Sequence, residues 1–194
     1  GTNGITMVDV HQQLTNLPDG LYKVSAELIT WANCATDQHV YAAAGNKVVS
    51  ENLPLGGWDT SEWTELMTTD YAVVIGGKLT IGAETTQGGT GSEGWFQATN
   101  FKLYYHGAAS AEQLQAAWES TEERANEALD ILIPNEKKEL ADVMAKATPL
   151  AAEGKYGDAC ALVIPVMSDL DSVLTATKNF YGSYYARLDT LRSR

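Results

Sequence analysis

Residues 21–31 read LYKVSAELITW, and their period decides the fold of the first half of the chain. Every second residue from Tyr22 to Leu28 is apolar or aromatic, and the residues between them are polar or charged. Such alternation is typical of a strand with one face buried and the other in water. The turn sequence PDG at 18–20 comes directly before it. The stretch predicts a half-buried β-strand that follows a tight turn.

Similar runs recur along residues 1–107, at 39–45, 71–77, 78–84 and 95–105, with Gly or Asn residues between them. No helical period interrupts them. Six or seven short strands at this spacing predict an antiparallel β-sandwich of the jelly-roll type. The predicted core consists of the apolar residues on one face of these strands: Val8, Val10, Tyr22, Val24, Leu28, Val40, Val73, Leu79, Ile81, Phe101 and Leu103.

The composition changes near Gly107, and the period changes with it. Fourteen of the 17 glycines precede Ala108, and all the arginines follow it. Beyond this point apolar residues recur at steps of three and four, which is typical of amphipathic helices. Pro134 and Gly154 divide this half into three helices. We therefore predict two domains, an all-β sandwich over 1–107 and an all-α, up-down-up three-helix bundle over 108–194.

The net charge of −12 limits the classes of partner. Nucleic acids and anionic membrane surfaces require clustered Lys and Arg, so we expect neither as a partner. No segment has the length and apolar character of a membrane span. Neutral partners are compatible with this charge. Cys34 and Cys160 are expected to be free and buried, with a disulfide between them as the open alternative.

The sequence offers little support for catalysis. Residues 89–94 fit the pattern G-x-G-x-x-G, but a strand follows them where a dinucleotide site requires a helix. The three histidines lie in or beside predicted strands, and no nucleophile elbow is present. We expect a protein that is not an enzyme and has no cofactor or metal. A glycoside hydrolase that uses Asp59 and Glu62 is kept as an alternative.

Four tryptophans fall at predicted strand ends or in loops, next to short polar residues. A flat ring that stacks on a sugar, with polar side chains for its hydroxyls, is typical of carbohydrate recognition. Alternatively, such tryptophans close the edge of a β-sandwich core. The predicted ligand-binding residues are Trp31, Asn33, Trp58, Asp59, Gln87 and Trp95.

Three motifs resemble those of galactose-binding-like jelly-roll domains, which occur in secreted and surface proteins of polysaccharide-degrading bacteria. They are VHQQLTNLPDGLYKVSAEL at 10–28, VIGGKLTIGAE at 74–84 and GWFQATNFKLYYHG at 94–107. The resemblance implies a non-catalytic carbohydrate-binding module. Gly76 and Thr99 stand where that family carries acids, which leaves a structural calcium ion open. One or two N-terminal strands of the full jelly roll are expected to be missing or rearranged.

Residues 110–180 are similar to the FIVAR-type three-helix modules of bacterial surface proteins, most clearly in EGKYGDACALVIPVMSDLDSVL at 153–174. This resemblance implies a spacer or a contact with another surface protein. Together the two resemblances imply a secreted or cell-surface protein whose partner is a neutral oligo- or polysaccharide. The alternative is a purely structural or protein-interaction module that binds no glycan.

Overall fold

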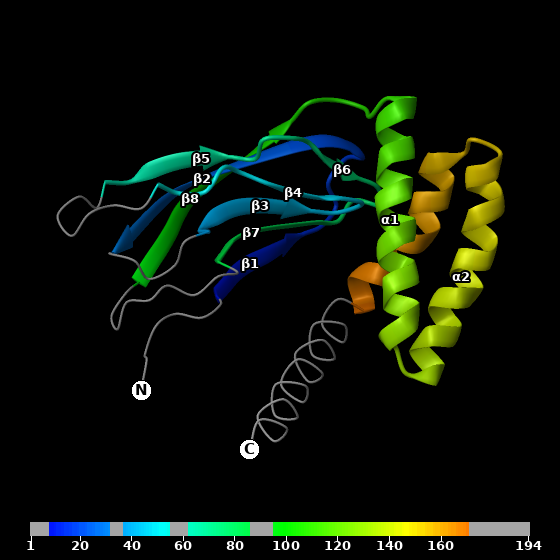
Figure 1. Ribbon diagram of the computed structural model, residues 1–194. Coiled ribbons are helices and arrows are strands. Elements are labelled where there is room, and N and C mark those ends of the chain that lie inside the picture. Colours follow the sequence, from blue (N-terminus) through cyan, green and yellow to red (C-terminus); the bar gives the residue numbers. More distant parts are fainter. Residues whose placement is uncertain (1–7, 32–36, 55–61, 86–94, 171–194) are drawn as a thin grey trace, which may run out of the picture. The chain divides into compact units, whose positions relative to one another are not determined.

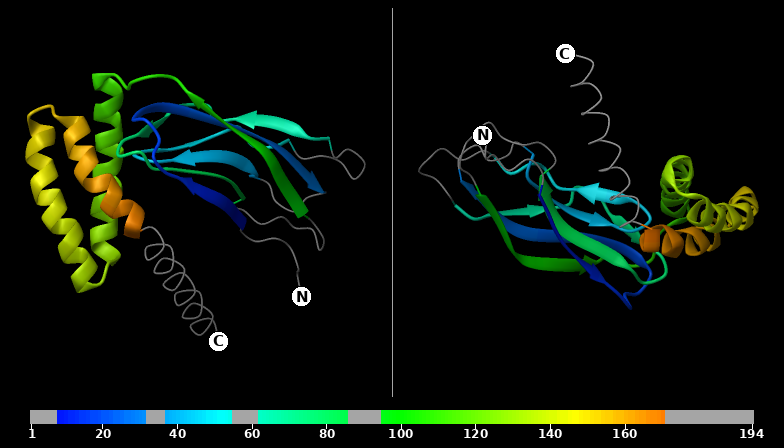
Figure 2. Two further views of the ribbon diagram at one scale, coloured as in Figure 1. Left: turned by 180° about the vertical axis from the view of Figure 1, so that it is seen from behind. Right: turned by 90° about the horizontal axis from the view of Figure 1, so that it is seen from below.

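The computed structural model describes residues 8–31, 37–54, 62–85 and 95–170, and the chain divides into two compact units, residues 1–110 and 111–194. The described part of the first unit consists of eight strands, and that of the second consists of helices (Figures 1 and 2). None of the described helices has the length and apolar character needed to span a bilayer. The elements are β1 (Val8–Leu14), β2 (Gly20–Trp31), β3 (His39–Ala43), β4 (Lys47–Val49), β5 (Thr64–Met67), β6 (Ala72–Val74), β7 (Leu79–Thr85), β8 (Trp95–Tyr105), α1 (Ala111–Ile131), α2 (Pro134–Ala152) and a helical segment at 156–170.

The strands form two antiparallel sheets, as the alternating sequence predicted. Sheet A has the order β1-β7-β3-β4. In sheet B the long strand β2 is central, with β8 on one side and β5 and β6 in succession on the other. Because β5 and β6 pair with different parts of β2, the described part of sheet B is at most three strands wide, whereas sheet A contains four strands. This difference in width positions the groove described below.

Alternate residues of both sheets contribute to one hydrophobic cluster, which defines the inner face of each sheet. Val24 and Leu28 of β2 and Val40 of β3 are completely buried in it. The sheets are also joined along one edge, where Ser50 bridges to Thr68 and the amide of Thr69 donates to the carbonyl oxygen of Val49 at 2.9 Å. At the opposite edge, β1 and β8 are paired only with β7 and β2 among the described strands.

Two residues of the predicted core are exposed, and that prediction is wrong for them. Val10 is 56% exposed because β1 is the edge strand of the four-stranded sheet A, and the described part of sheet B is at most three strands wide. Phe101 is 36% exposed because β8 bulges there. Two residues, Asn100 and Phe101, oppose the single residue Ala26 of β2, and Asn100 has a positive φ of 53°.

The helical unit follows the predicted period. In α1 the buried residues include Trp118, Thr121 and Ala125, and in α2 they include Leu140 and Met144. The α1 and α2 helices lie side by side (Figure 1). The third segment, 156–170, is also helical. Three helices at the C-terminal end are therefore confirmed, while their arrangement as a bundle stays a prediction.

Candidate functional site

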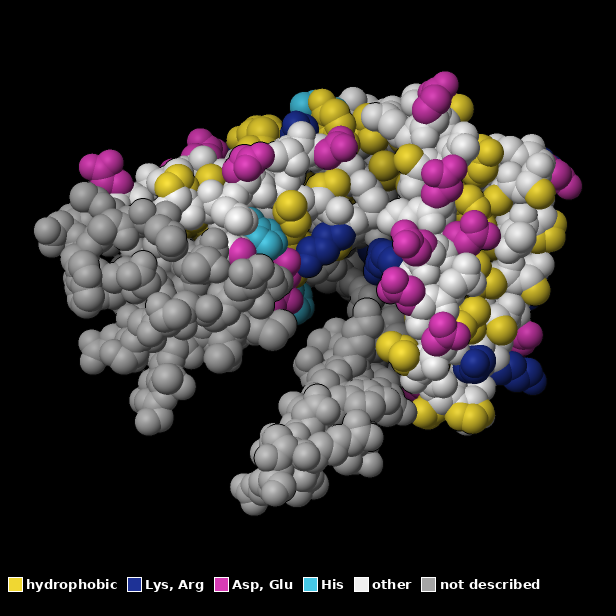
Figure 3. Space-filling model, in the orientation of Figure 1, with side chains coloured by type: hydrophobic (Ala, Val, Ile, Leu, Met, Phe, Trp, Pro, Cys, Tyr) yellow, Lys and Arg dark blue, Asp and Glu magenta, His cyan; other side chains and the backbone are white. Residues whose placement is uncertain are grey.

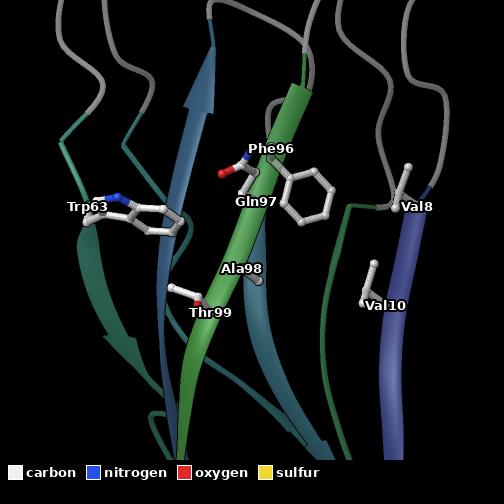
Figure 4. A pocket seen from close by; sticks show the side chains of 7 residues that line it. All are labelled: Val8, Val10, Trp63, Phe96, Gln97, Ala98 and Thr99. Atoms are coloured by element: carbon white, nitrogen blue, oxygen red, sulfur yellow. The ribbon is translucent and has the colours of Figure 1, made fainter.

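A groove with a volume of about 550 Å³ lies at one end of the two sheets, along the edge where β1 and β8 have no further partner among the described strands (Figure 4). Its lining comes from the start of β1, the start of β8 and the residue before β5. None of these seven described residues has a titratable side chain. They are Val8, Val10, Trp63, Phe96, Gln97, Ala98 and Thr99.

The groove contains an exposed tryptophan. Trp63 directly precedes β5, which pairs with β2, and 47% of its surface is exposed. Its indole extends toward Gln97 and Thr99, which point to the same side of β8 (Figure 4). The cross-strand partner of Gln97 is Ile29, which is only 8% exposed. An aromatic ring, an amide and a hydroxyl thus gather on the outer face of sheet B.

Phe96 and Ala98 point to the other side of β8. Phe96 points toward Val8 and Val10 of β1 (Figure 4). Phe96 and Ala98 pair with Thr30 and Leu28, so they lie on the inner face of sheet B and pack partly against the hydrophobic cluster. The groove therefore joins an outer, partly polar surface to an inner, apolar one.

Buried hydrogen bonds hold the strand ends that carry this groove. Gln38 Nε2 donates to Thr30 Oγ1 at 2.9 Å, and Thr85 Oγ1 donates to Asp37 Oδ1 at 2.7 Å. Thr30 is the cross-strand partner of Phe96, and Thr85 is the partner of Val8. These four polar residues are buried, so the core is polar at this end. Hydrogen bonds between them fix the strand ends in place of apolar packing.

The structure brings two of the predicted binding residues together. Trp31 and Trp95 are cross-strand partners in β2 and β8, two positions beyond the pair of Ile29 and Gln97. The side chains of both tryptophans lie outside the described part of the chain. Asn33, Trp58, Asp59 and Gln87 also lie outside the described residues.

The residues that line the groove were not selected from the sequence, although one signal was available for Trp63. In residues 62–68, EWTELMT, Trp63 lies two and four positions before Glu65 and Met67, so in an extended chain these three side chains point to the same face. Thr64 and Leu66 point to the opposite face. Glu65 and Met67 are both exposed, and Leu66 packs against the core. The period-two pattern therefore places Trp63 on the solvent face. By contrast, no local pattern shows that Val8 and Phe96 lie near each other.

The outer face of sheet A carries a second group of polar side chains, in which each acid is already engaged. Glu84 Oε1 lies 2.9 Å from His39 Nε2 and 2.7 Å from Lys47 Nζ. Tyr41 donates its hydroxyl hydrogen to Asp9 Oδ1 at 2.8 Å. Figure 3 shows histidine, acidic and basic side chains gathered over β3 and β7. Among the described residues, no group of His, Cys, Asp and Glu is placed to hold a metal ion.

The pKa values in this second group follow from its contacts. The hydrogen bond to Glu84 raises the pKa of His39, and the bond from its other ring nitrogen to the carbonyl oxygen of Asp37 acts in the same direction. Burial alone would raise the pKa of Glu84, but the hydrogen bonds from His39 and Lys47 together hold it below its ordinary value. Both groups are thus held in their charged forms, as in a structural ion cluster.

Comparisons with known proteins identify no family. No protein-family model matches the chain, and no curated protein sequence matches it significantly. A solved structure described as "EclA C-terminal domain; sugar-binding protein" is similar with 16% identity and a TM-score of 0.37. The match covers 50% of this chain and 76% of that one. A likeness at this level carries no argument about the fold or the ligand.

Proposed function

We propose that the first unit is a non-catalytic module that binds a neutral glycan in the groove at the end of its two sheets. In this proposal the sheets form a jelly-roll sandwich of the galactose-binding-like type. The helices form a three-helix bundle that acts as a spacer or contacts another protein. A module of this kind would work outside the cell membrane, on an oligo- or polysaccharide.

The observation that carries the proposal is the exposed indole of Trp63 beside Gln97 and Thr99. An indole face packs against the apolar C–H face of a sugar ring, and an amide and a hydroxyl can each donate to and accept from sugar hydroxyls. Binding sites for small ligands are usually apolar surfaces with a few polar groups that point toward the same ligand.

The charge of the groove favours a neutral ligand. None of the seven described lining residues can be ionised, so this part of the lining offers no cation to pair with a carboxylate or sulfate. The net charge of −12 on the whole chain would repel an acidic polysaccharide as well. The seven described lining residues include no carboxylate, and glycoside hydrolysis requires a pair of them.

The residues chosen from the sequence complete the proposed site. Trp31 and Trp95 form a backbone pair at the end of sheet B that carries the groove. Residues 32–36 continue from Trp31, and residues 86–94 lead to Trp95. Residues 55–61 precede Trp63 closely in the chain. We propose that Asn33, Trp58, Asp59 and Gln87, which belong to these three segments, contribute further contacts to the glycan.

Titration of the full chain with a panel of neutral oligosaccharides, followed by NMR and calorimetry, tests the proposal. We expect Trp63→Ala to weaken binding about tenfold, or about 1.4 kcal/mol, because it removes the apolar ring surface that the sugar would bury. Met67→Ala is the matched control, since Met67 lies on the same face of β5 and is 43% exposed. The control variant should bind like the unmodified chain.

Two results would contradict the proposal. If no neutral glycan binds more tightly than about 10 mM, the weak end of specific recognition, glycan binding is wrong. If a glycan binds but Trp63→Ala and Met67→Ala leave its affinity equally unchanged, the glycan occupies another surface. Hydrolysis of any glycoside in the panel would show that the protein is an enzyme.

A further inference from the structure

The groove consists of two halves with different chemistry, one on each side of β8 (Figure 4). The polar half is formed by Trp63, Gln97 and Thr99. The apolar half is formed by the other four lining residues, whose side chains contain only carbon and hydrogen: Val8, Val10, Phe96 and Ala98. The two halves are continuous, because all seven residues line one cavity of about 550 Å³.

The apolar half is open because of the unequal widths of the two sheets. Val10 lies on the inner face of sheet A, since its partner Ala83 is completely buried there. Yet 56% of the surface of Val10 is exposed, because no described strand of sheet B continues past β8 to cover it. An inner-face valine in water is a favourable contact for any apolar group, since burial of apolar surface is favourable in proportion to its area.

A second sugar ring fits the apolar half poorly. Its hydroxyl groups would find no side-chain donor or acceptor among Val8, Val10, Phe96 and Ala98. A hydroxyl that loses water without gaining a partner costs free energy, and this loss would offset the contacts made by its carbons. An alkyl or aryl group has no such cost.

We infer that the ligand is a neutral glycoside with an apolar aglycone, with the sugar in the polar half and the aglycone in the apolar half. This inference rests on the proposed function, and it names the ligand class of the same groove. The sugar stacks on Trp63 and exchanges hydrogen bonds with Gln97 and Thr99. The alkyl or aryl substituent crosses β8 and covers Val10 and Phe96.

A second copy of this chain is a less favourable occupant. Two copies would each bring a net charge of −12 to the contact, and the seven described lining residues include no cationic side chain to offset their repulsion. The uncharged lining instead matches a small ligand that is itself uncharged.

Paired ligands test the inference in the full chain. Methyl and hexyl β-glycosides of glucose, galactose and N-acetylglucosamine are titrated by NMR, at concentrations below micelle formation. We expect at least one hexyl glycoside to bind about tenfold more tightly than its methyl partner, the gain from burying about two methylene groups. The double variant Val8→Thr/Val10→Thr should lose this gain and keep the affinity for the methyl glycoside. Threonine has the shape and strand preference of valine, so the sheet is conserved.

Two further variants complete the design. Val49→Thr is the matched control, because Val49 is also an exposed valine of sheet A, at 38%, and lies outside the groove lining. It should keep the gain for the hexyl glycoside. Trp63→Ala should weaken the methyl and hexyl ligands by the same factor, since the sugar is common to both.

The possible failures are distinguishable. If a methyl glycoside binds at Trp63 and its hexyl partner binds equally well, the inference is wrong and glycan binding stands. If hexyl glycosides bind regardless of the sugar and of Trp63→Ala, the groove is an apolar site and the proposed function is wrong. If no glycoside binds, the inference is wrong, and the proposed function is then decided by the panel of neutral oligosaccharides. If sedimentation shows a dimer that Val8→Thr/Val10→Thr dissociates, the occupant is a second copy and the inference is overturned.

Discussion

Nε2 of His39 lies 2.9 Å from Oε1 of Glu84, and the two residues are cross-strand partners in β3 and β7. The other ring nitrogen of His39 lies 2.7 Å from the carbonyl oxygen of Asp37. Both ring nitrogens therefore face acceptors, an arrangement that favours the doubly protonated imidazolium. Lys47 reaches the same carboxylate oxygen at 2.7 Å. Two cations and one acid thus join three chain segments on the outer face of sheet A.

This cluster predicts a maximum in its contribution to stability at mildly acidic pH. The pKa of His39 is raised on folding. The contribution of His39 to the free energy of unfolding is therefore complete below about pH 6.5, and it is lost as the pH rises through the pKa of His39 in the folded protein. The pKa of Glu84 is lowered on folding. The contribution of Glu84 to the free energy of unfolding is therefore present above about pH 4.5, and it is lost as the pH falls through the pKa of Glu84 in the folded protein. We expect Glu84→Gln to destabilise the protein most near pH 5.5, by about 1–3 kcal/mol.

Urea unfolding at pH 4, 5.5 and 8 measures this effect. The difference in unfolding free energy between the unmodified chain and Glu84→Gln should be smaller at both extremes than in the middle. Glu51→Gln, at an exposed acid in the same unit, is the control and should give a difference close to zero at every pH. A constant difference for Glu84→Gln across the three pH values would show that the ionisation of the cluster does not matter.

Gly82 is required by the packing of sheet A. A Cβ atom at this position would lie 2.7 Å from Cε1 of Tyr41 and 2.7 Å from the carbonyl oxygen of Val10. The carbonyl belongs to β1, which pairs with β7 at this residue, so it cannot move without loss of the strand pairing. We expect Gly82→Ala to destabilise the first unit by about 1–3 kcal/mol in urea unfolding, as overpacked substitutions do.

A glycine in the helical unit provides the contrast. A Cβ atom at Gly157, in the helical segment 156–170, would meet only Cδ1 and Cδ2 of Leu114 at ordinary contact distances of 3.7 and 4.0 Å. Gly157→Ala should therefore stabilise the helical unit by about 0.5–1 kcal/mol. Equal effects of the two substitutions, in sign and size, would mean that steric fit at Gly82 is not what decides the outcome.

Local patterns predicted most of the fold. The alternation in residues 21–31 placed Tyr22, Val24 and Leu28 on the inner face, because the side-chain period of a strand is a property of the chain itself. The exposure of Val10 could not be predicted in this way. It depends on the number of strands in the opposite sheet, and the residues near Val10 in the sequence carry no information about that number. The groove has the same origin, since β1 and β8 meet there only after folding.

The turn before β7 is a second feature that could not be predicted from local sequence patterns. Gly76 and Gly77 have positive φ values of 78° and 71°, which glycine adopts without strain. Both amides donate to Oδ1 of Asp19, at 2.9 and 3.2 Å. The carboxylate at this turn therefore comes from Asp19, which belongs to a distant part of the sequence. A contact between residues 57 positions apart is not visible in a local motif.

Removal of this carboxylate should loosen the turn. Asp19→Ala leaves two backbone amides without their acceptor, and we expect a loss of about 1–2 kcal/mol in the unfolding free energy of the first unit. Asp19→Asn is the matched control, because its side-chain oxygen can still accept both hydrogen bonds. A loss of the same size in both variants would assign the effect to the charge of Asp19 and would contradict its role as an acceptor.

Cys160 is completely buried in the helical segment 156–170, and burial raises the pKa of its thiol to about 11 despite a hydrogen bond with Thr121. At pH 8 only about one thiol in a thousand would be ionised, and the thiolate is the form that reacts. In a Cys34→Ser background, we therefore expect Ellman's reagent to modify Cys160 at least about a hundredfold more slowly in buffer than in concentrated urea, where an ordinary thiol is about one quarter ionised at this pH. The same variant in urea is the control, since unfolding restores an ordinary thiol. Modification in buffer at a rate near that in urea would show that this part of the helical unit opens readily and does not protect its core.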